Sequence, residues 1–316
     1  MKRNLSPVES CGRAGAAFLA LLAAPAIAQD GPAGASVISP AAGTEVWASM
    51  DSDGTDVIKV LARGLWRFES RERYTGIAVE HAWFHPSTGA DEEHDRVYFD
   101  AADSLGSDWR WRARVGTDGD TVLGSAELRR ADWSHSLFVE REIVETDQGL
   151  RRGIYYTFAG ASTDLRIGDT DTLAVTAGVQ EFTGRNERLH LRGRYVHALS
   201  AVPGLSAQLD TRYYHSTRPG EYDYFSPKDF IRAVPLVQMR RFTRSGWMVL
   251  GAAGIGGQRS TGAGWTVARL GQLRFESPRS ARNADVFGEL LYTNDSISGG
   301  TSYDYLMARA GVTVRF

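Results

Sequence analysis

The carboxyl-terminal stretch YDYLMARAGVTVRF, residues 303–316, decides the fold. Its even positions from 306 onward are all apolar: Leu306, Ala308, Ala310, Val312, Val314 and Phe316. Its odd positions are mostly polar and include Arg309, Thr313 and Arg315. Because successive side chains of a strand point to opposite faces, the stretch predicts a β-strand with one apolar and one polar face. The apolar face ends on an aromatic residue.

The same stretch resembles the C-terminal insertion signal of bacterial outer-membrane β-barrels. That signal has a polar residue, a glycine two positions on, and hydrophobic or aromatic residues at alternate positions to the end. Arg309, Gly311, Val314 and Phe316 match it position by position. The resemblance implies recognition by the barrel-assembly machinery. The alternative is the closing strand of a soluble β domain.

The amino end predicts export. Lys2 and Arg3 precede an uncharged apolar run at 14–24, and Ala26 and Ala28 form a small-x-small cleavage site. The apolar run is too short for a membrane anchor, which needs about 20 residues. We therefore predict a signal peptide at 1–28, cleaved after Ala28. The only cysteine, Cys11, lies within it, so no disulfide is expected in the mature chain.

The balance of charges argues against a nucleic-acid partner. Lys and Arg number 36 against 38 Asp and Glu, so no strong basic excess exists. No stretch is apolar enough to form a spanning helix. A barrel in lipid needs none, because lipid-facing residues alternate with residues that face water.

Sixteen alternating runs follow a Gly/Ala/Ser/Pro-rich segment at 29–43, which we expect to be flexible and periplasmic. Turn sequences such as DSDG, PSTG and VPG separate them. The predicted strands are 44–50, 55–68, 74–85, 95–103, 108–116, 121–131, 135–145, 151–166, 171–182, 187–200, 204–215, 229–242, 246–257, 265–276, 283–293 and 303–316. The predicted fold is all-β: a transmembrane antiparallel up-and-down barrel at 44–316, with fourteen or eighteen strands as alternatives.

Alternation also sorts the side chains into two faces. Leu189 and Leu191 oppose Arg188, Arg192 and Arg194, for example. Arginine pointing into mid-membrane lipid costs about 2–4 kcal/mol, so the charged face must line the lumen. The predicted lumen or substrate path comprises Lys59, Arg63, Arg67, Arg110, Arg112, Arg114, Arg188, Arg192, Arg194, Arg212 and Arg309.

Fewer acidic residues are expected on the inner face: Glu127, Asp210, Asp285 and Glu289. A pore lined by one sign of charge concentrates ions of the other sign, so an open pore should favour anions. The alternative is that Arg–Glu pairs brace the wall and leave little net charge.

The longest predicted outer connection is HSTRPGEYDYFSPKD at 215–229. We predict that Tyr222, Asp223, Tyr224 and Phe225 form a constriction and contact sugar rings. The alternative is an aromatic cluster that packs the loop on the barrel rim. Pro235, in the next strand, cannot donate to the sheet and predicts a bulge or bend.

The segment Tyr224-Phe225-Ser226-Pro227, followed by a hydrophobic strand, resembles the C-terminal barrels of bacterial exopolysaccharide export proteins. These are the cellulose and poly-N-acetylglucosamine exporters and the related YaiO-type small outer-membrane barrels. The resemblance implies an outer-membrane conduit for a polysaccharide, working with a separate periplasmic scaffold protein.

Catalytic and metal-binding alternatives find weak support. His85-Pro86-Ser87 and His215-Ser216 are the closest His/Ser pairs, but neither is followed by the Asn of phospholipase-type barrels. The acidic segment 51–56 lacks the Glu that a calcium loop carries at its twelfth position, and it predicts a hairpin turn. We predict no enzyme activity, no metal and no cofactor.

The sequence therefore predicts a channel in the outer membrane of a Gram-negative bacterium. It would contact outer-membrane lipid and lipopolysaccharide. An exporter of an anionic exopolysaccharide is the first reading. A general or anion-selective diffusion porin and a lipid hydrolase are the alternatives.

Deleting Phe316 should impair assembly and leave the chain in the periplasm, because the apolar face would lose its terminal aromatic residue. Heat-modifiable migration on gels and surface exposure measure this. Phe316→Trp, which keeps an aromatic ring, serves as the control. Normal migration and exposure of the deletion variant would contradict the insertion-signal reading.

Overall fold

The computed structural model describes residues 38–278, 284–296 and 302–316. The predicted signal peptide at 1–28, and the part of the 29–43 segment before residue 38, lie outside these residues. The strands are β1 (Ser39–Asp51), β2 (Asp56–Ser70), β3 (Arg73–His85), β4 (Glu92–Leu105), β5 (Trp109–Thr117), β6 (Val122–Arg130), β7 (His135–Ile143), β8 (Tyr155–Arg166), β9 (Asp171–Phe182), β10 (Glu187–Ala198), β11 (Leu205–Ser216), β12 (Asp229–Phe242), β13 (Met248–Ser260), β14 (Thr266–Glu276), β15 (Ala284–Ser296) and β16 (Ser302–Arg315).

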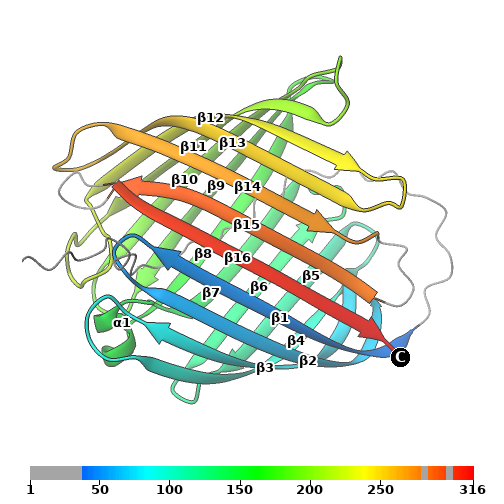
Figure 1. The fold of residues 1–316 in the computed structure, drawn as a ribbon, viewed down its shortest axis with the longest axis horizontal. Helices are drawn as coiled ribbons and strands as arrows, with labels where there is room; N and C mark the ends of the chain where they lie inside the picture. Colours follow the sequence, from blue (N-terminus) through cyan, green and yellow to red (C-terminus); the bar gives the residue numbers. More distant parts are fainter. Residues whose placement is uncertain (1–37, 279–283, 297–301) are drawn as a thin grey trace, which may run out of the picture.

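The sixteen strands form one closed barrel in which each pairs with its neighbours in sequence. Closure comes from β1 and β16, which lie side by side in Figure 1 and pair antiparallel from Ala41↔Arg315 to Asp51↔Tyr305. The backbone N–H of Phe316 continues this ladder by donating to the Pro40 carbonyl at 3.0 Å. The predicted antiparallel up-and-down barrel of sixteen strands is confirmed.

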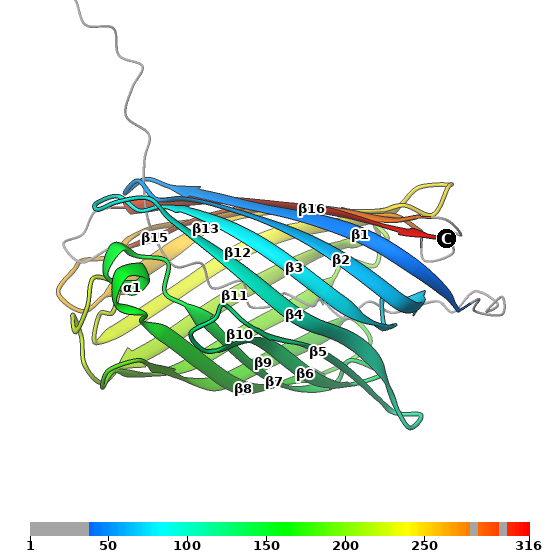
Figure 2. The ribbon, with the colours of Figure 1, turned by 90° about the horizontal axis from the view of Figure 1, so that it is seen from below.

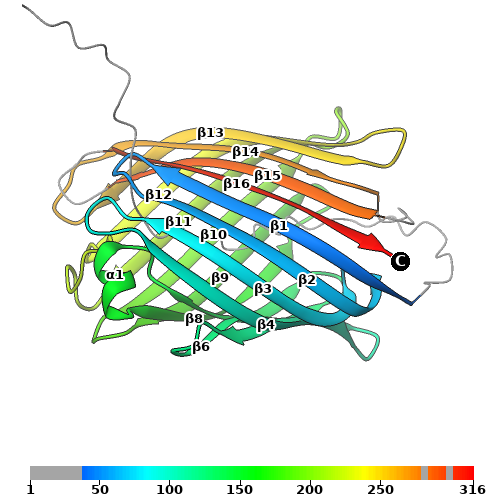
Figure 3. The ribbon, with the colours of Figure 1, turned by 60° about the horizontal axis from the view of Figure 1, so that its bottom comes forward.

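The barrel has two unlike ends. The proximal end holds the start of β1 and the C-terminus, and the distal end lies opposite (Figure 1). The longest described connections, 144–154 and 217–228, are both distal. The first contains the short helix α1 (Asp147–Arg152), seen at the distal end in Figures 2 and 3. No helix among the described residues is long and apolar enough to cross a bilayer.

The two-residue period gives the outer surface an apolar band. Leu189, Leu191, Ile231, Val237 and Leu273 are among its exposed side chains. Some of its exposed aromatic rings lie toward the ends of the strands, with Trp66 and Phe316 proximal and Trp265 distal. Apolar bands flanked by aromatic residues are typical of barrels that span membranes.

Three local features differ from the sequence prediction. The first strand begins at Ser39, before residue 44. The pairing of β2 with β3 shifts register between Leu65 and Arg67 and again after Phe68. The first shift turns Phe68 into a buried cluster with Leu65 and Tyr74, whereas unbroken alternation along β2 predicts Phe68 on the outer face. Pro235 causes no bulge, because the register of β12 and β13 is the same on both sides of it, at Ala233↔Gly257 and at Leu236↔Gly254. Only the two residue pairs between these positions are missing from the ladder.

A charge placed on the outer face should destabilise the barrel according to its depth. We expect Leu191→Arg to cost about 2–4 kcal/mol, because residue 191 lies in the middle of the apolar band. The matched control Leu105→Arg, on the outer face at the proximal end of β4, should cost about 0–1 kcal/mol. Reversible chemical unfolding in phospholipid vesicles measures both. Equal costs would contradict the face assignment.

Candidate functional site

The candidate site is the lumen wall together with the distal mouth. Strand register places the predicted path residues on inward positions, where they alternate with the apolar outer face. Arg67 is the exception: the register shift pairs it with Thr75, beside the inward pair Phe68↔Tyr74, so it leaves the inward face near the proximal end, where it forms ion pairs of 2.7 Å to Glu69 and to Asp103. The inward set therefore includes the lysine and the arginines predicted from alternation except Arg67, whose position the register shift in β2 reverses.

The wall from β16 through β1 to β7 is braced by ion pairs. Glu45 binds Arg63 at 2.9 Å and Arg309 at 2.6 Å. Arg114 binds Asp100 at 3.1 Å. Sequence analysis missed Glu45 and Asp100, although each lies in step with neighbouring inward residues of its strand.

One further brace in this part of the wall follows the same pattern. Arg112 binds Glu127, a predicted inner acid, at 3.0 Å. Arg110 turns to the carbonyls of Ser107 and Trp109 instead. This part of the wall therefore fits the alternative in which charge pairs brace the barrel.

A second network joins strands that are not neighbours. Lys59 on β2 lies 2.6 Å from Glu145, in the connection after β7, and 4.0 Å from Glu142 on β7. Arg96 on β4 bridges Glu142 and Glu80, with 3.0 Å to each. These contacts connect the β2–β4 wall with β7 near the distal end and narrow the lumen between them.

The wall formed by β10, β11 and β12 is strongly basic. Its inward side chains include Arg188, Arg192, Arg194, Arg212 and Arg232. Among the described inward residues of β9 to β13, Asp210 is the single carboxylate, and it binds Arg194 at 2.8 Å and Arg232 at 3.2 Å. Arg232 was missed because the β12 sequence is nearly continuous in apolar residues.

Arg188 has a different environment from the other path residues. It is 5% exposed, and it donates to Ser216 Oγ at 3.2 Å and to the Phe225 carbonyl at 2.6 Å. Its guanidinium lies over the rings of Phe182 and Tyr214, 5.1 and 4.6 Å from their centroids. Arg188 thus fastens the 217–228 connection to the wall.

The predicted constriction residues pack on neighbouring elements. Tyr224 stacks on Phe182 with ring centroids 4.3 Å apart, and its hydroxyl accepts a bond from Asn186 at 2.9 Å. Burial raises the pKa of Tyr224, which keeps the hydroxyl protonated. Tyr222 packs against the same cluster, and Phe225 lies edge-on to Phe230 at 6.2 Å. These contacts favour rim packing for the aromatic rings.

Asp223 differs from the three aromatic residues because it forms hydrogen bonds to the other long distal connection. It accepts from Thr146 Oγ1 at 2.6 Å and from the backbone N–H of Gln148 at 2.8 Å. Both partners belong to the 144–154 connection, which sequence analysis split between two strands. The constriction role of the four residues therefore remains a prediction, and only Asp223 is described with hydrogen bonds to the 144–154 connection.

Local sequence explains why residues 144–154 leave the strand pattern. Thr146 caps α1 by accepting from the backbone N–H of Gly149 at 3.2 Å, and Gly153 ends the helix at φ 62°. Val144 and Ile154 are buried with the Tyr224 cluster, and Leu150 packs with residues of β2 to β4. The connection therefore lies between two walls at the distal mouth. The sequence contains the residues that mark both ends of this helix, Thr146 as the N-cap and Gly153 after the last turn.

In one of the two alternative catalytic pairs, His215 and Ser216, the side chains are separated. His215 pairs with Asp229 at 2.8 Å, whereas Ser216 is buried beside Arg188, so the two side chains leave opposite faces of β11. The 51–56 segment is a hairpin turn, as predicted, in which Asp51 Oδ1 accepts from the backbone N–H of Asp53 and Gly54 at 3.0 and 2.9 Å.

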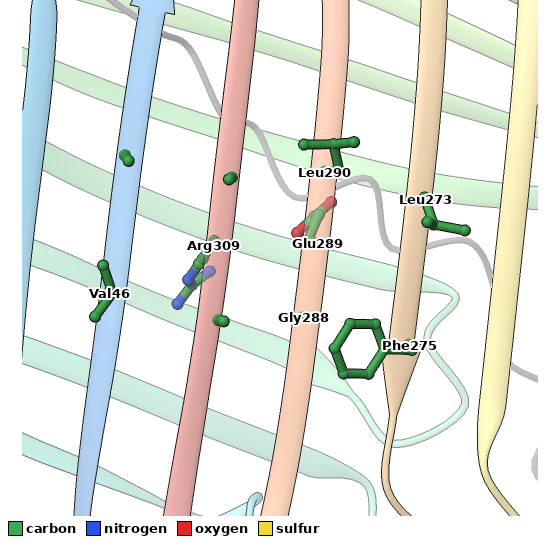
Figure 4. Close-up of a pocket in the computed structure, with 10 residues that line it drawn as sticks. Val46, Leu273, Phe275, Gly288, Glu289, Leu290 and Arg309 are labelled. Carbon is green, nitrogen blue, oxygen red and sulfur yellow. The ribbon is translucent and has the colours of Figure 1, made fainter.

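An apolar groove lies on the outer face at the seam of β1, β16, β15 and β14 (Figure 4). Small residues at Ala48, Gly288 and Ala308 leave it open beside Phe275 and Leu290. A Cβ at position 288 would lie 2.3 Å from the Phe275 ring, so a side chain there would displace that ring. Because the groove belongs to the apolar band, it is a surface for lipid and not part of the lumen.

Solved structures similar to this chain have low sequence identity to it. A bacterial polysaccharide outer membrane secretin has a TM-score of 0.60 at 13% identity and covers 87% of this chain and 98% of its own. Pseudomonas aeruginosa OccK5 (OpdH) has 0.43 at 9%, covering 88% and 98%. The KdgM porin in complex with disordered oligogalacturonate has 0.34 at 9%, covering 87% and 99%. No protein-family model matches the chain, and no curated protein matches it significantly. The similarity to the secretin, at a TM-score of 0.60, shows that the two proteins share a fold.

Asp223→Ala should loosen the 144–154 connection, because it removes both bonds that hold this connection to 217–228. We expect a higher single-channel conductance in planar bilayers. Glu221→Ala is the control: Glu221 bonds the Arg185 backbone in the same loop and touches no residue of 144–154 in the bonds described. A lower melting temperature with unchanged conductance would favour rim packing alone.

Proposed function

We propose that this chain is an outer-membrane channel that favours anions and serves as a conduit for an anionic exopolysaccharide. The observation that carries the proposal is the basic inner wall of β10 to β12, where Arg188, Arg192, Arg194, Arg212 and Arg232 accompany one inward carboxylate, Asp210. Such a wall raises the local concentration of anions inside a pore.

Three further features support a channel in the outer membrane. The exterior has the apolar band that lipid requires, and the interior is polar and charged. The sequence carries features of a signal peptide and of a barrel insertion signal. A structure similar to this chain, with a TM-score of 0.60, is described as a bacterial polysaccharide outer membrane secretin.

The polysaccharide itself is supported by resemblance in the segment Tyr224-Phe225-Ser226-Pro227. Of these residues, Tyr224 and Phe225 pack on the rim at the distal mouth, and Ser226 accepts from the backbone N–H of Gly220 at 2.9 Å. An ordered distal loop suits an exit surface for a polymer.

A diffusion porin that prefers small anions is the second candidate. The network of Lys59, Glu142 and Arg96 favours it, because a fixed bridge between walls limits the size of a passing solute. Deleting the gene in the native host separates the two candidates. Loss of secreted acidic polysaccharide supports export, whereas loss of uptake of small anions with normal secretion supports the porin.

The wild-type channel should prefer chloride over potassium in a salt gradient across a planar bilayer. Arg212→Gln should lower this preference, and the difference should grow at low salt, because screening extends over about 10 Å at 0.1 M and further when diluted. Arg185→Gln makes the same charge change on an exposed distal turn and should leave selectivity unchanged. A cation-selective wild-type channel would contradict the proposal.

A further inference from the structure

One residue of the proximal rim has an unusual backbone. Trp133, in the turn 131–134 between β6 and β7, has φ 65° and is the only residue other than glycine with a positive φ in the described part of the chain. A bulky side chain rarely adopts this conformation, because its Cβ crowds the backbone. Such strain persists only where the surroundings hold it, and it is concentrated at sites that bind ligands.

The turn 131–134 is held from both sides by neighbouring elements. The backbone N–H of Ala131 donates to the carbonyl of Asp108, in the turn before β5, at 2.7 Å. On the other side, the carbonyl of Ser134 accepts from the backbone N–H of Asp164 on β8 at 2.8 Å. These bonds keep Trp133 in its left-handed conformation and place its turn beside the turn that precedes β5.

The ring of Trp133 lies on the lumen side of the rim. Arg129, in step with the inward Glu127 on β6, covers one face of the ring with its guanidinium 3.4 Å from the centroid. Arg129 also binds Glu72 at 3.3 Å. The Trp133 side chain is only partly buried and belongs to none of the four apolar clusters of the described residues. The second face of the ring is therefore available to a ligand at the mouth of the pore.

Arg110 is the residue that faces Arg129 from β5. It is partly exposed, and its Nη1 donates to the carbonyls of Ser107 and Trp109 at 3.3 and 3.0 Å. A guanidinium has five N–H groups, so these two bonds leave donors for an oxyanion. The proximal rim thus places a free ring face and an arginine fork on either side of Arg129.

Carboxylates of the two turns engage groups close to them in sequence. Asp108 accepts from Ser107 Oγ at 2.9 Å. Asp132 accepts from Ser134 Oγ at 2.7 Å and lies 3.6 Å from Arg130. The rim therefore carries both signs of charge, and recognition by it depends on the geometry of ring and fork and not on an excess of positive charge.

The proximal end is the side from which an exported polymer enters. In bacterial barrels the short turns face the periplasm and the long connections face outside. The connections 144–154 and 217–228 are distal, so the turn 131–134 faces the periplasm.

We propose that Trp133 and Arg110 form an entry subsite for one acidic sugar unit of the polymer. The C–H face of the sugar ring stacks on the second face of Trp133, and the sugar carboxylate accepts two parallel bonds from the Arg110 fork. The inference deepens the proposed function and rests on it for the class of ligand. A ring that its backbone holds in place loses little freedom on binding, and this benefit offsets the strain.

Isothermal titration calorimetry on the purified full-length barrel in detergent measures binding without requiring conduction. The probes are hexagalacturonate and the neutral hexamer maltohexaose. We expect both to bind, and the acidic hexamer to bind about tenfold more tightly, because only it offers a carboxylate to Arg110.

Trp133→Gly separates binding from folding. Glycine adopts φ 65° without strain, so the melting temperature should stay close to that of the wild type. Loss of the ring should weaken the binding of both hexamers about tenfold or more, as for other aromatic anchors. A purely structural tryptophan predicts the reverse, a lower melting temperature with unchanged binding. The control Trp265→Ala removes an exposed ring at the distal end and should leave binding unchanged.

Arg110→Gln should remove the preference for hexagalacturonate over maltohexaose, because the fork that recognises the carboxylate is lost. Arg110→Lys keeps the charge without the fork, so it should lower the preference as well. The control Arg244→Gln makes the same charge change as Arg110→Gln on another proximal turn, between β12 and β13, and should alter the affinity less than about twofold, because exposed charges are screened over about 10 Å at 0.1 M salt.

Three results would overturn the subsite. They are the absence of hexagalacturonate binding to a folded, heat-modifiable wild-type barrel, wild-type binding by Trp133→Gly, and equal weakening by Arg110→Gln and Arg244→Gln, which would mean a diffuse field. Each can occur in a channel that prefers chloride and secretes an acidic polysaccharide, so the subsite can fail while the proposed function stands. Binding through Trp133 in a cation-selective channel would contradict the proposed function and leave the subsite in place.

Discussion

No backbone group of this protein can be left unpaired where it meets lipid, and the rest of the structure depends on that constraint. An unsatisfied N–H or carbonyl in hydrocarbon costs several kcal/mol, so a sheet in a membrane must close on itself. Pairing of β1 with β16 achieves the closure. Once the register is fixed, side chains divide strictly between lipid and lumen, and every charge within the apolar band must be accommodated inside.

Two solutions to that internal crowding of charge coexist. From β16 through β1 to β7, arginines alternate with acids such as Glu45, Asp100 and Glu127, and the wall is nearly self-neutralising. On β10 to β12, aromatic rings under Arg188 and Arg212 take part of that role, because a ring face attracts a cation without adding negative charge. The second solution leaves a positive wall, and this difference between halves is the basis for the functional proposals.

Sequence reasoning recovered the fold because alternation is a local signal that the membrane makes strict. The β9 and β12 ranges were predicted to the residue, whereas the β2 end was not, since a register shift near Arg67 reverses the pattern for Phe68. The site was predicted less completely. Inward arginines follow from alternation, but the contact of Lys59 with Glu145 joins residues far apart in sequence and depends on how the barrel closes. The short α1 helix was missed although its capping residues, Thr146 and Gly153, are visible in the sequence. The strong strand patterns on both sides outweighed them.

The three shortest strands, β5, β6 and β7, have nine residues each, whereas β1 and β3 have thirteen. At about 3.3 Å per residue and a tilt near 40°, nine residues span roughly 23 Å of membrane thickness and thirteen span roughly 33 Å. A lipid shell around this barrel therefore meets unequal heights on its two sides. We expect the bilayer to thin beside β5–β7 and the barrel axis to lean, since tilting reduces hydrophobic mismatch at modest cost. The orientation of the protein in its membrane would then be set by three short strands.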